Sequence, residues 1–324
     1  MNFGITPREW EDFFGEAVIQ CRLAESLGFH SIWIEEHHMH PEYLPSPLIA
    51  VTALAQHLKN MYVGTNVAIL PLYHPLRFAE DVATLHQTVE GKLILGVGSG
   101  YRQVDFENFG IALDSRRGRM DEALQLIREV WSGERVDFNG KHFNFKNVRL
   151  HPRLYQGKAP PIWVGGWKRP AIRRAAILGD RWFPGPVADM VTVRNCVGVY
   201  KRELEHANKE FNGFPIMRDI YLSRTSADAI QESRHAFLHM YGDDYSKSGH
   251  PIVGGAEMRF EDWAVDRFII GDESDAIETV DGLRKLGADH LVLRVSIRGL
   301  KHEQIMNTIR IFGEKVIPHF NNRQ

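Results

Sequence analysis

The chain has 324 residues, 44% of them hydrophobic, and 39 Lys and Arg against 41 Asp and Glu leave a formal charge of −2. This length can bury a large core, and the near-zero charge gives no long-range attraction to nucleic acid or to an anionic membrane. The two cysteines, Cys21 and Cys196, lie far apart, so we expect neither a disulfide framework nor a cysteine-rich zinc site. With no secretory signal and no membrane-spanning apolar stretch in the sequence, we expect a cytoplasmic protein.

Short apolar runs alternate with amphipathic stretches nearly from end to end, which is typical of parallel strands joined by helices. Eight strands are predicted, at 2–5, 31–34, 61–70, 93–97, 162–164, 181–183, 217–223 and 290–295. Helices are predicted at about 10–27, 47–58, 75–89, 115–132, 168–178, 188–211, 226–241, 273–286 and 301–315. This α/β pattern favours one closed (β/α)8 TIM barrel over residues 1–324. A doubly wound open sheet is the alternative, because the sequence does not show whether the last strand meets the first.

Two segments interrupt the alternation. Residues 135–146 place apolar side chains at every second position around Asn139-Gly140, which predicts a hairpin inserted outside the barrel. Residues 242–268 gather glycine, aspartate, serine and proline over a length that is unusual for a plain connection. We predict that this second segment forms a lid over the active site.

The strand at 31–34 ends in the run Glu35-Glu36-His37-His38-Met39-His40. Carboxylates and imidazoles move protons or bind metals, and active sites of strand-helix folds lie at the carboxyl ends of the strands. His38-Met39-His40 has the HxH spacing of barrel metallohydrolases, which makes such an enzyme one alternative. The motif follows the second strand, however, and residues 291–296 bring no carboxylate to complete a metal site. We therefore predict an active site without a metal.

Two further strand ends are rich in glycine. Gly96-Val97-Gly98-Ser99-Gly100-Tyr101 has a tyrosine where a dinucleotide-binding fingerprint needs glycine, yet its backbone can approach a ligand closely. Gly165-Gly166-Trp167-Lys168 leads into a predicted helix, whose N-terminus with Lys168 and Arg169 would suit a phosphate. Each pattern taken alone is equally compatible with a turn that binds nothing.

Two single residues also stand out. His74 could face the same mouth as His37, although a capping or core role is favoured for it. Arg294 lies in an otherwise apolar strand, where a charge is costly unless it is paired. We favour its pairing with a buried carboxylate over contact with an anionic ligand.

Taken together in chain order, these motifs resemble the bacterial-luciferase-like flavin-dependent monooxygenases. The resemblance is carried by the Glu-His-His strand end and by residues 64–75, 79–85, 95–110, 161–166 and 316–318. It implies a (β/α)8 barrel with insertions, a homodimer, and a two-component monooxygenase. Such an enzyme takes reduced FMN from a separate flavin reductase and uses O2 to oxygenate a small organic substrate. An F420-dependent hydride-transfer oxidoreductase and a non-catalytic flavin-binding partner subunit remain as alternatives.

The resemblance also implies roles for individual residues. His37 matches a histidine that assists proton transfer near the flavin, and we predict that His37 and His38 are the catalytic residues. Asn66-Val67 matches a position where the family often carries a non-proline cis peptide bond beneath the flavin ring. The predicted cofactor-binding residues are Glu36, Asn66, Val67, Gly98, Ser99, Gly100, Tyr101, Gly165, Gly166, Trp167 and Lys168.

Two positions depart from the luciferase pattern. Luciferases carry an arginine where this chain has Ser99, so the charge that binds the flavin phosphate is expected from Arg102, Lys168 or Arg169. The reactive cysteine of some luciferases corresponds to Gly98, so nothing in the predicted chemistry depends on a thiol.

Overall fold

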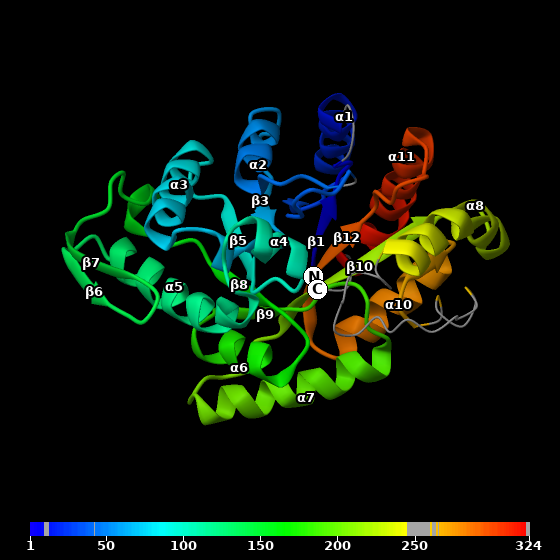
Figure 1. Ribbon diagram of the computed structural model, residues 1–324. Helices are drawn as coiled ribbons and strands as arrows, with labels where there is room; N and C mark the ends of the chain where they lie inside the picture. Colours follow the sequence, from blue (N-terminus) through cyan, green and yellow to red (C-terminus); the bar gives the residue numbers. More distant parts are fainter. Residues whose placement is uncertain (10–12, 42, 245–259, 261–263, 265, 322–324) are drawn as a thin grey trace.

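Strands and helices alternate along the chain in the computed structural model, which describes residues 1–9, 13–41, 43–244, 260, 264 and 266–321 (Figure 1). The strands are β1 (Asn2–Thr6), β2 (Ser31–Ile34), β3 (Tyr62–Thr65), β4 (Ala68–Ile69), β5 (Leu93–Gly98), β6 (Val136–Asn139), β7 (Asn144–Val148), β8 (Ile162–Gly165), β9 (Arg181–Phe183), β10 (Phe214–Leu222), β11 (Ile269–Gly271) and β12 (Ala288–Arg294). The helices are α1 (Phe13–Ser26), α2 (Pro47–Ala55), α3 (Pro75–Thr88), α4 (Gln103–Asn108), α5 (Arg116–Trp131), α6 (Arg169–Ile177), α7 (Met190–His206), α8 (Ser226–Leu238), α10 (Glu273–Lys285), α11 (His302–Ile311) and α12 (Ile317–Asn321).

The main sheet is parallel and follows the chain around a barrel. Its order is β11-β10-β12-β1-β2-β3-β5-β8-β9, so the first strand pairs with the last one, β12. The barrel closes between β10 and β9, where Met217 N in β10 donates a 3.1 Å hydrogen bond to the oxygen of Pro184, directly after β9. The predicted TIM-barrel fold is confirmed. The doubly wound alternative is wrong, because the strand order follows the chain without the reversal that such a sheet requires.

The third predicted strand differs from the expectation. Residues 61–70 form two short strands instead of one. β3 pairs with β5 only through Val63 and Gly64, and β4 pairs with β5 further along the chain, through Ala68. The Asn66-Val67 peptide bond lies between them and is cis, as predicted. The structure also contains β11, a strand that the sequence analysis missed, paired with the end of β10.

Bulky side chains fill the interior of the barrel, as they do in other barrels of this class. Trp33 is fully buried there, with its ring 5.1 Å from Trp163 and 5.3 Å from Phe183 between ring centroids. Gly64 on the neighbouring strand leaves room for it, since a Cβ at this position would lie 2.4 Å from the Trp33 ring. The glycine and the tryptophan therefore form one packing unit.

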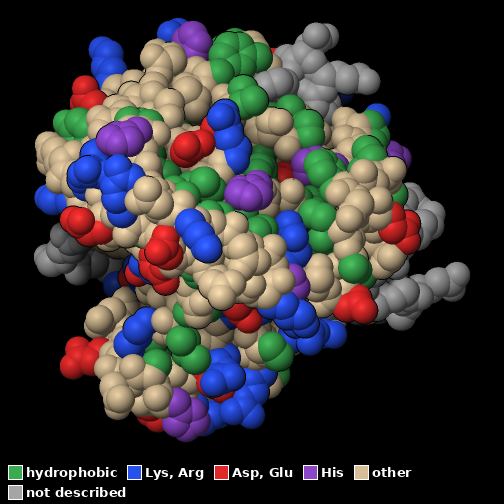
Figure 2. Space-filling model, turned by 60° about the vertical axis from the view of Figure 1, so that its left-hand side comes forward, with side chains coloured by type: hydrophobic (Ala, Val, Ile, Leu, Met, Phe, Trp, Pro, Cys, Tyr) green, Lys and Arg blue, Asp and Glu red, His purple; other side chains and the backbone are tan. Residues whose placement is uncertain are grey.

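The helices surround the strands, and a second, larger apolar cluster lies between the two layers (Figure 1). The antiparallel pair β6/β7 lies outside the barrel, where the period-2 pattern predicts a hairpin. Figure 2 shows Lys and Arg side chains interspersed with Asp and Glu over one face of the molecule. Most of the predicted lid, 242–268, lies outside the described residues. None of the described helices is both long and apolar enough to span a bilayer.

Replacing Trp33 with alanine should leave a cavity in the barrel interior and lower the free energy of unfolding by about 3–5 kcal/mol. Urea unfolding followed by circular dichroism measures the loss. Ile49→Ala is the control, because Ile49 on α2 is 73% exposed and its truncation should change stability by less than about 0.5 kcal/mol. Equal effects of the two changes would contradict this account of the interior.

Candidate active site

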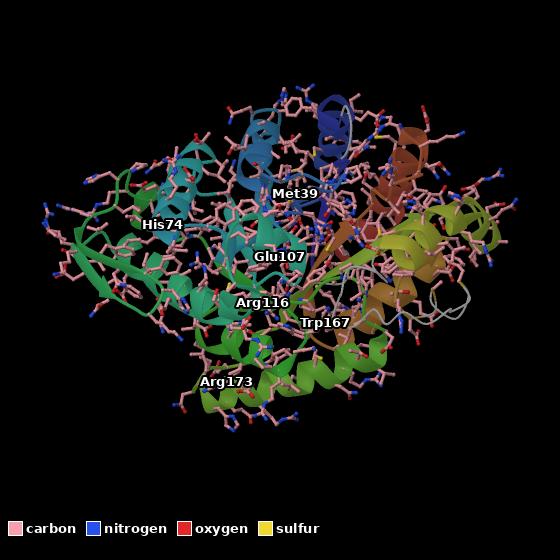
Figure 3. The ribbon with its side chains drawn as sticks, in the orientation of Figure 1. Met39, His74, Glu107, Arg116, Trp167 and Arg173 are labelled. Atoms are coloured by element: carbon pink, nitrogen blue, oxygen red, sulfur yellow. The ribbon has the colours of Figure 1, made fainter. Side chains whose placement is uncertain are left out.

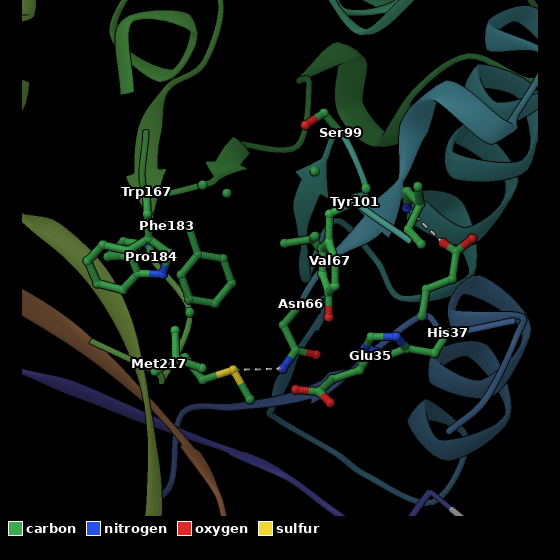
Figure 4. Close-up of a pocket in the computed structure, with 18 of the residues that line it drawn as sticks. Glu35, His37, Asn66, Val67, Ser99, Tyr101, Trp167, Phe183, Pro184 and Met217 are labelled. Atoms are coloured by element: carbon green, nitrogen blue, oxygen red, sulfur yellow. Dashed lines mark hydrogen bonds between the residues drawn. The ribbon is translucent and has the colours of Figure 1, made fainter. Parts of the chain in front are cut away.

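A cavity opens at the carboxyl ends of the barrel strands, where a parallel barrel brings its loops together (Figure 4). Every strand end that the sequence analysis singled out contributes to it: residues 35–37 after β2, 66–67 after β3, 98–102 at the end of β5 and 165–167 at the end of β8. The loop at 184–187 after β9, together with Met217 of β10, completes the wall. Residues far apart in the sequence therefore form one site.

All but two of the predicted site residues line this cavity. His38 and Lys168 do not, and Lys168 is exposed at the residue that precedes α6. The sequence analysis named Glu35 but gave it no role, and it missed Asp105, Met217 and the loop 184–187. The Pro184-Gly185-Pro186 run directly after a predicted strand was a signal for this loop. No sequence signal pointed to Asp105.

His37 is partly buried at the cavity, and its ring centroid lies 4.2 Å from that of Tyr43. Burial lowers the pKa of the imidazole well below its usual value, and the nearby positive charge of Arg102 lowers this pKa further. The ring is therefore neutral at pH 7. A neutral imidazole can accept a proton from a group in the cavity and return it.

Glu36 lines the cavity, but its carboxylate is engaged by the protein itself. A 2.7 Å hydrogen bond joins its Oε1 to His38 Nε2, and its Oε2 accepts bonds from Ile69 N and Tyr73 OH, each at 2.9 Å. Burial, followed by the charge of Glu36, raises the pKa of Tyr73, so the phenol keeps its proton and donates. Glu36 thus links the end of β2 to β4 and to the residues that precede α3, and it orients His38.

Of the three cations expected near a phosphate, Arg102 lines the cavity. Its Nη1 donates to the oxygen of His38 at 2.9 Å and to Asp105 Oδ1 at 3.1 Å, which holds the guanidinium in place. Arg169 is exposed and donates to Glu203 Oε1 at 2.8 Å. Lys168 and Arg169 thus lie outside the cavity.

His74 lies outside the site. Figure 3 places it on the side of the β6/β7 hairpin, away from Trp167, and its ring lies 5.9 Å from Phe143 and 6.1 Å from Phe145. The favoured non-catalytic interpretation therefore agrees with its position. Among the described residues, no group of three His, Cys, Asp or Glu side chains is placed to hold a metal ion.

A buried ion-pair network lies beneath the cavity. Arg294, at the end of β12, donates from Nε and Nη2 to the two oxygens of Asp219 at 2.7 and 2.9 Å, and from Nη1 to both oxygens of Glu35 at 3.3 Å. Tyr241 OH also donates to Asp219 Oδ2. The predicted structural pairing of Arg294 is confirmed, since its side chain is 98% buried between two carboxylates.

Glu9 adds a third carboxyl group to this network. Its Oε1 accepts a 2.9 Å bond from the backbone N–H of Glu35, and its Oε2 is buried with no hydrogen-bond partner among the described residues. Burial, reinforced by the neighbouring Glu35, raises the pKa of Glu9 well above its usual value. A proton on Glu9 lessens the repulsion between these two carboxyl groups.

The chain is similar to several known proteins. The family profile described as luciferase-like monooxygenase matches residues 6–290. The oxygenase component of the flavin-dependent trigonelline monooxygenase of Acinetobacter baylyi is 29% identical over 157 residues, 48% of this chain and 43% of that protein. The F420-dependent glucose-6-phosphate dehydrogenase of Microbacterium testaceum is 26% identical over 318 residues, 93% and 92% of the two chains. The monooxygenase RslO1 from Streptomyces bottropensis has the same fold, with a TM-score of 0.86 over 99% of this chain and 100% of that one, at 24% identity.

The raised pKa of Glu9 predicts how stability depends on pH. Above the usual pKa of a glutamate, the folded protein retains a proton that the unfolded chain has released, so stability falls as the pH rises through this interval. Glu9→Gln keeps an oxygen acceptor but cannot ionise, so its urea midpoint should decrease less between pH 5 and pH 8. Glu129→Gln, at an exposed position of α5, should keep the wild-type slope. An unchanged slope in Glu9→Gln would mean that Glu9 ionises normally.

Proposed function

Since the chain belongs to the luciferase-like monooxygenase family, we propose that it is the oxygenase of a two-component system that oxygenates a small organic substrate. Reduced FMN would come from a separate flavin reductase, and the enzyme would work as a homodimer. The observation that carries the proposal is a neutral His37 on a cavity that is lined in part by glycine backbone and aromatic side chains.

The residues of the cavity fit a flavin. Gly98 contributes no side chain to the cavity wall. A Cβ at this position would lie 2.5 Å from Val67 Cγ2, so an added side chain would force Val67 or the backbone at Gly98 to move. Val67 lies on one side of the cavity, and Phe183 and Trp167 lie on the other (Figure 4). A flat aromatic ring system would be bound between such surfaces.

Reduced flavin would supply the two electrons needed to place one oxygen atom of O2 in the substrate and to release the other as water. His37 would hold or deliver the proton for this chemistry, because its imidazole is neutral at pH 7. The apolar side chains exclude water from the reacting groups. Arg102, held by Asp105 and the backbone of His38, would bind the phosphate of the cofactor.

Hydride transfer to or from the deazaflavin F420 is the second candidate function. It is favoured by the relative from Microbacterium testaceum, which aligns over 92% of its own length and is F420-dependent by name. The same cavity would accept a deazaflavin ring, because the glycine and apolar walls contact a flat ring without distinguishing its atoms.

Titration with each cofactor should separate the two candidates. We expect the protein to bind FMN, with quenching of flavin fluorescence, and to consume oxygen when reduced FMN is supplied. Gly98→Ala should weaken FMN binding by about tenfold or more, because the added methyl group displaces Val67. Gly15→Ala is the matched control, since a Cβ at Gly15 meets nothing within 4 Å. F420-supported hydride transfer without FMN binding would overturn the first proposal.

The proposed role of His37 predicts a particular pH profile. Because its pKa is lowered, the neutral imidazole persists below pH 6.5, and the acid limb of oxygen uptake with reduced FMN should lie below that pH. His37→Asn should slow this reaction by about 10²–10⁴-fold and abolish the limb. An acid limb at or above pH 6.5, or one that the variant retains, would contradict the role.

A further inference from the structure

The imidazole of His37 makes no hydrogen bond to any of the described residues. Its neighbour His38 differs, because Nε2 of that ring is bonded to Glu36 Oε1 at 2.7 Å. A side chain that transfers protons is usually oriented by a third group, such as the carboxylate of a catalytic triad. His37 has no such group among the described residues, so packing must fix the direction in which its ring nitrogens point.

The backbone around His37 is held by the protein. Arg102 Nη1 donates to the oxygen of His38 at 2.9 Å, directly after His37. His37 N donates to the oxygen of Leu44 at 3.2 Å, which brings the end of this loop back towards its beginning. These bonds fix the position of the His37 Cα atom, but they do not fix the side-chain torsions that rotate the imidazole.

The ring of Tyr43 supplies a contact that can fix these torsions. Its centroid lies 4.2 Å from that of His37, with 43° between the ring planes. The half-buried Tyr43 ring also lies 5.0 Å from His40, so it is held in its turn. The distance from His37 to His40 is longer, at 6.3 Å. Tyr43 is therefore the nearest aromatic neighbour of His37 among the described residues, and contacts between such rings have preferred orientations.

We propose that Tyr43 is a positioning residue, which holds the imidazole of His37 in the orientation required for proton transfer in the cavity. Its ring supplies the contact, so its hydroxyl group is not needed for this role. Orientation by packing leaves both imidazole nitrogens able to exchange protons, whereas a hydrogen bond would occupy one of them. The role of Tyr43 in the reaction rests on the proposed function, because it assumes that His37 transfers protons there.

Oxygen uptake with reduced FMN tests this role. Tyr43→Ala should slow the reaction at saturating FMN by about tenfold or more and leave the FMN affinity unchanged, because a misplaced group reacts poorly. Tyr43→Phe should retain the wild-type rate. Tyr43→Ala should add no further loss to His37→Asn, since the effects of two residues that act through one another are not additive.

Tyr62→Ala is the matched control and should leave the rate unchanged. The ring of Tyr62 stacks on that of His30 at 4.7 Å, so this variant also removes a tyrosine that packs on a histidine. Tyr62 begins β3, and the starts of the strands lie at the opposite end of the barrel from the cavity.

NMR relaxation of the histidine ring carbons in the flavin-free protein is the second measurement. The imidazole of His37 should be rigid in the wild type and in Tyr43→Phe, and mobile on the picosecond to nanosecond timescale in Tyr43→Ala. If Tyr43→Ala does not fold, Tyr43→Leu, which keeps bulk but has no flat ring, takes its place with the same expectation.

Four results would each overturn the proposal: a mobile His37 ring in the wild type, a rigid one in Tyr43→Ala, an unchanged rate in that variant, or an equal further loss in the His37→Asn background. A wild-type protein that consumes no oxygen with reduced FMN contradicts only the proposed function. The relaxation measurement then decides by itself whether Tyr43 orients the imidazole, because it needs no cofactor.

Discussion

The pairing of Arg294 with Asp219 and Glu35 is the interaction on which the mouth of the barrel depends. It joins three strands, because Arg294 ends β12, Asp219 lies in β10 and Glu35 follows β2. A guanidinium is costly to bury unless carboxylates are buried with it, so these groups require one another. The network therefore joins β10, β12 and the end of β2 beside the cavity that Glu35 lines.

The adjacent residues Glu35 and Glu36 have different contacts, and this difference follows from the network. Neighbouring side chains along an extended chain point to opposite faces, so Glu35 points into the barrel towards Arg294, and Glu36 points towards Ile69 and Tyr73. Glu36 therefore supports the wall that carries Val67, and Glu35 is left facing the cavity. A pair of carboxylates that looks equivalent in the sequence thus has one structural member and one that can contact a ligand.

Much of the site could be predicted, because parallel strands bring their carboxyl ends to one edge. His37, Asn66 and the glycine runs at 98–101 and 165–167 meet at one cavity for that reason. Lys168 lies outside the cavity lining, because one residue beyond Trp167 the chain has already turned outward into α6. The strand predicted at 61–70 was too long. A run of hydrophobic residues does not reveal where the backbone hydrogen bonds between this segment and β5 are interrupted.

The sequence by itself determined the alternation of strands and helices, and hence the barrel and the end at which its site lies. These properties follow from local periodicity and from residues at strand ends. Only the tertiary structure decided the neutral state of His37, the engagement of Glu36 and the position of Glu35 between Arg294 and the cavity. Each depends on burial and on charged neighbours that are distant along the chain, such as Glu35 and Arg294, which are 259 residues apart. Such pairings leave no periodic pattern, because the fold alone brings the partners together.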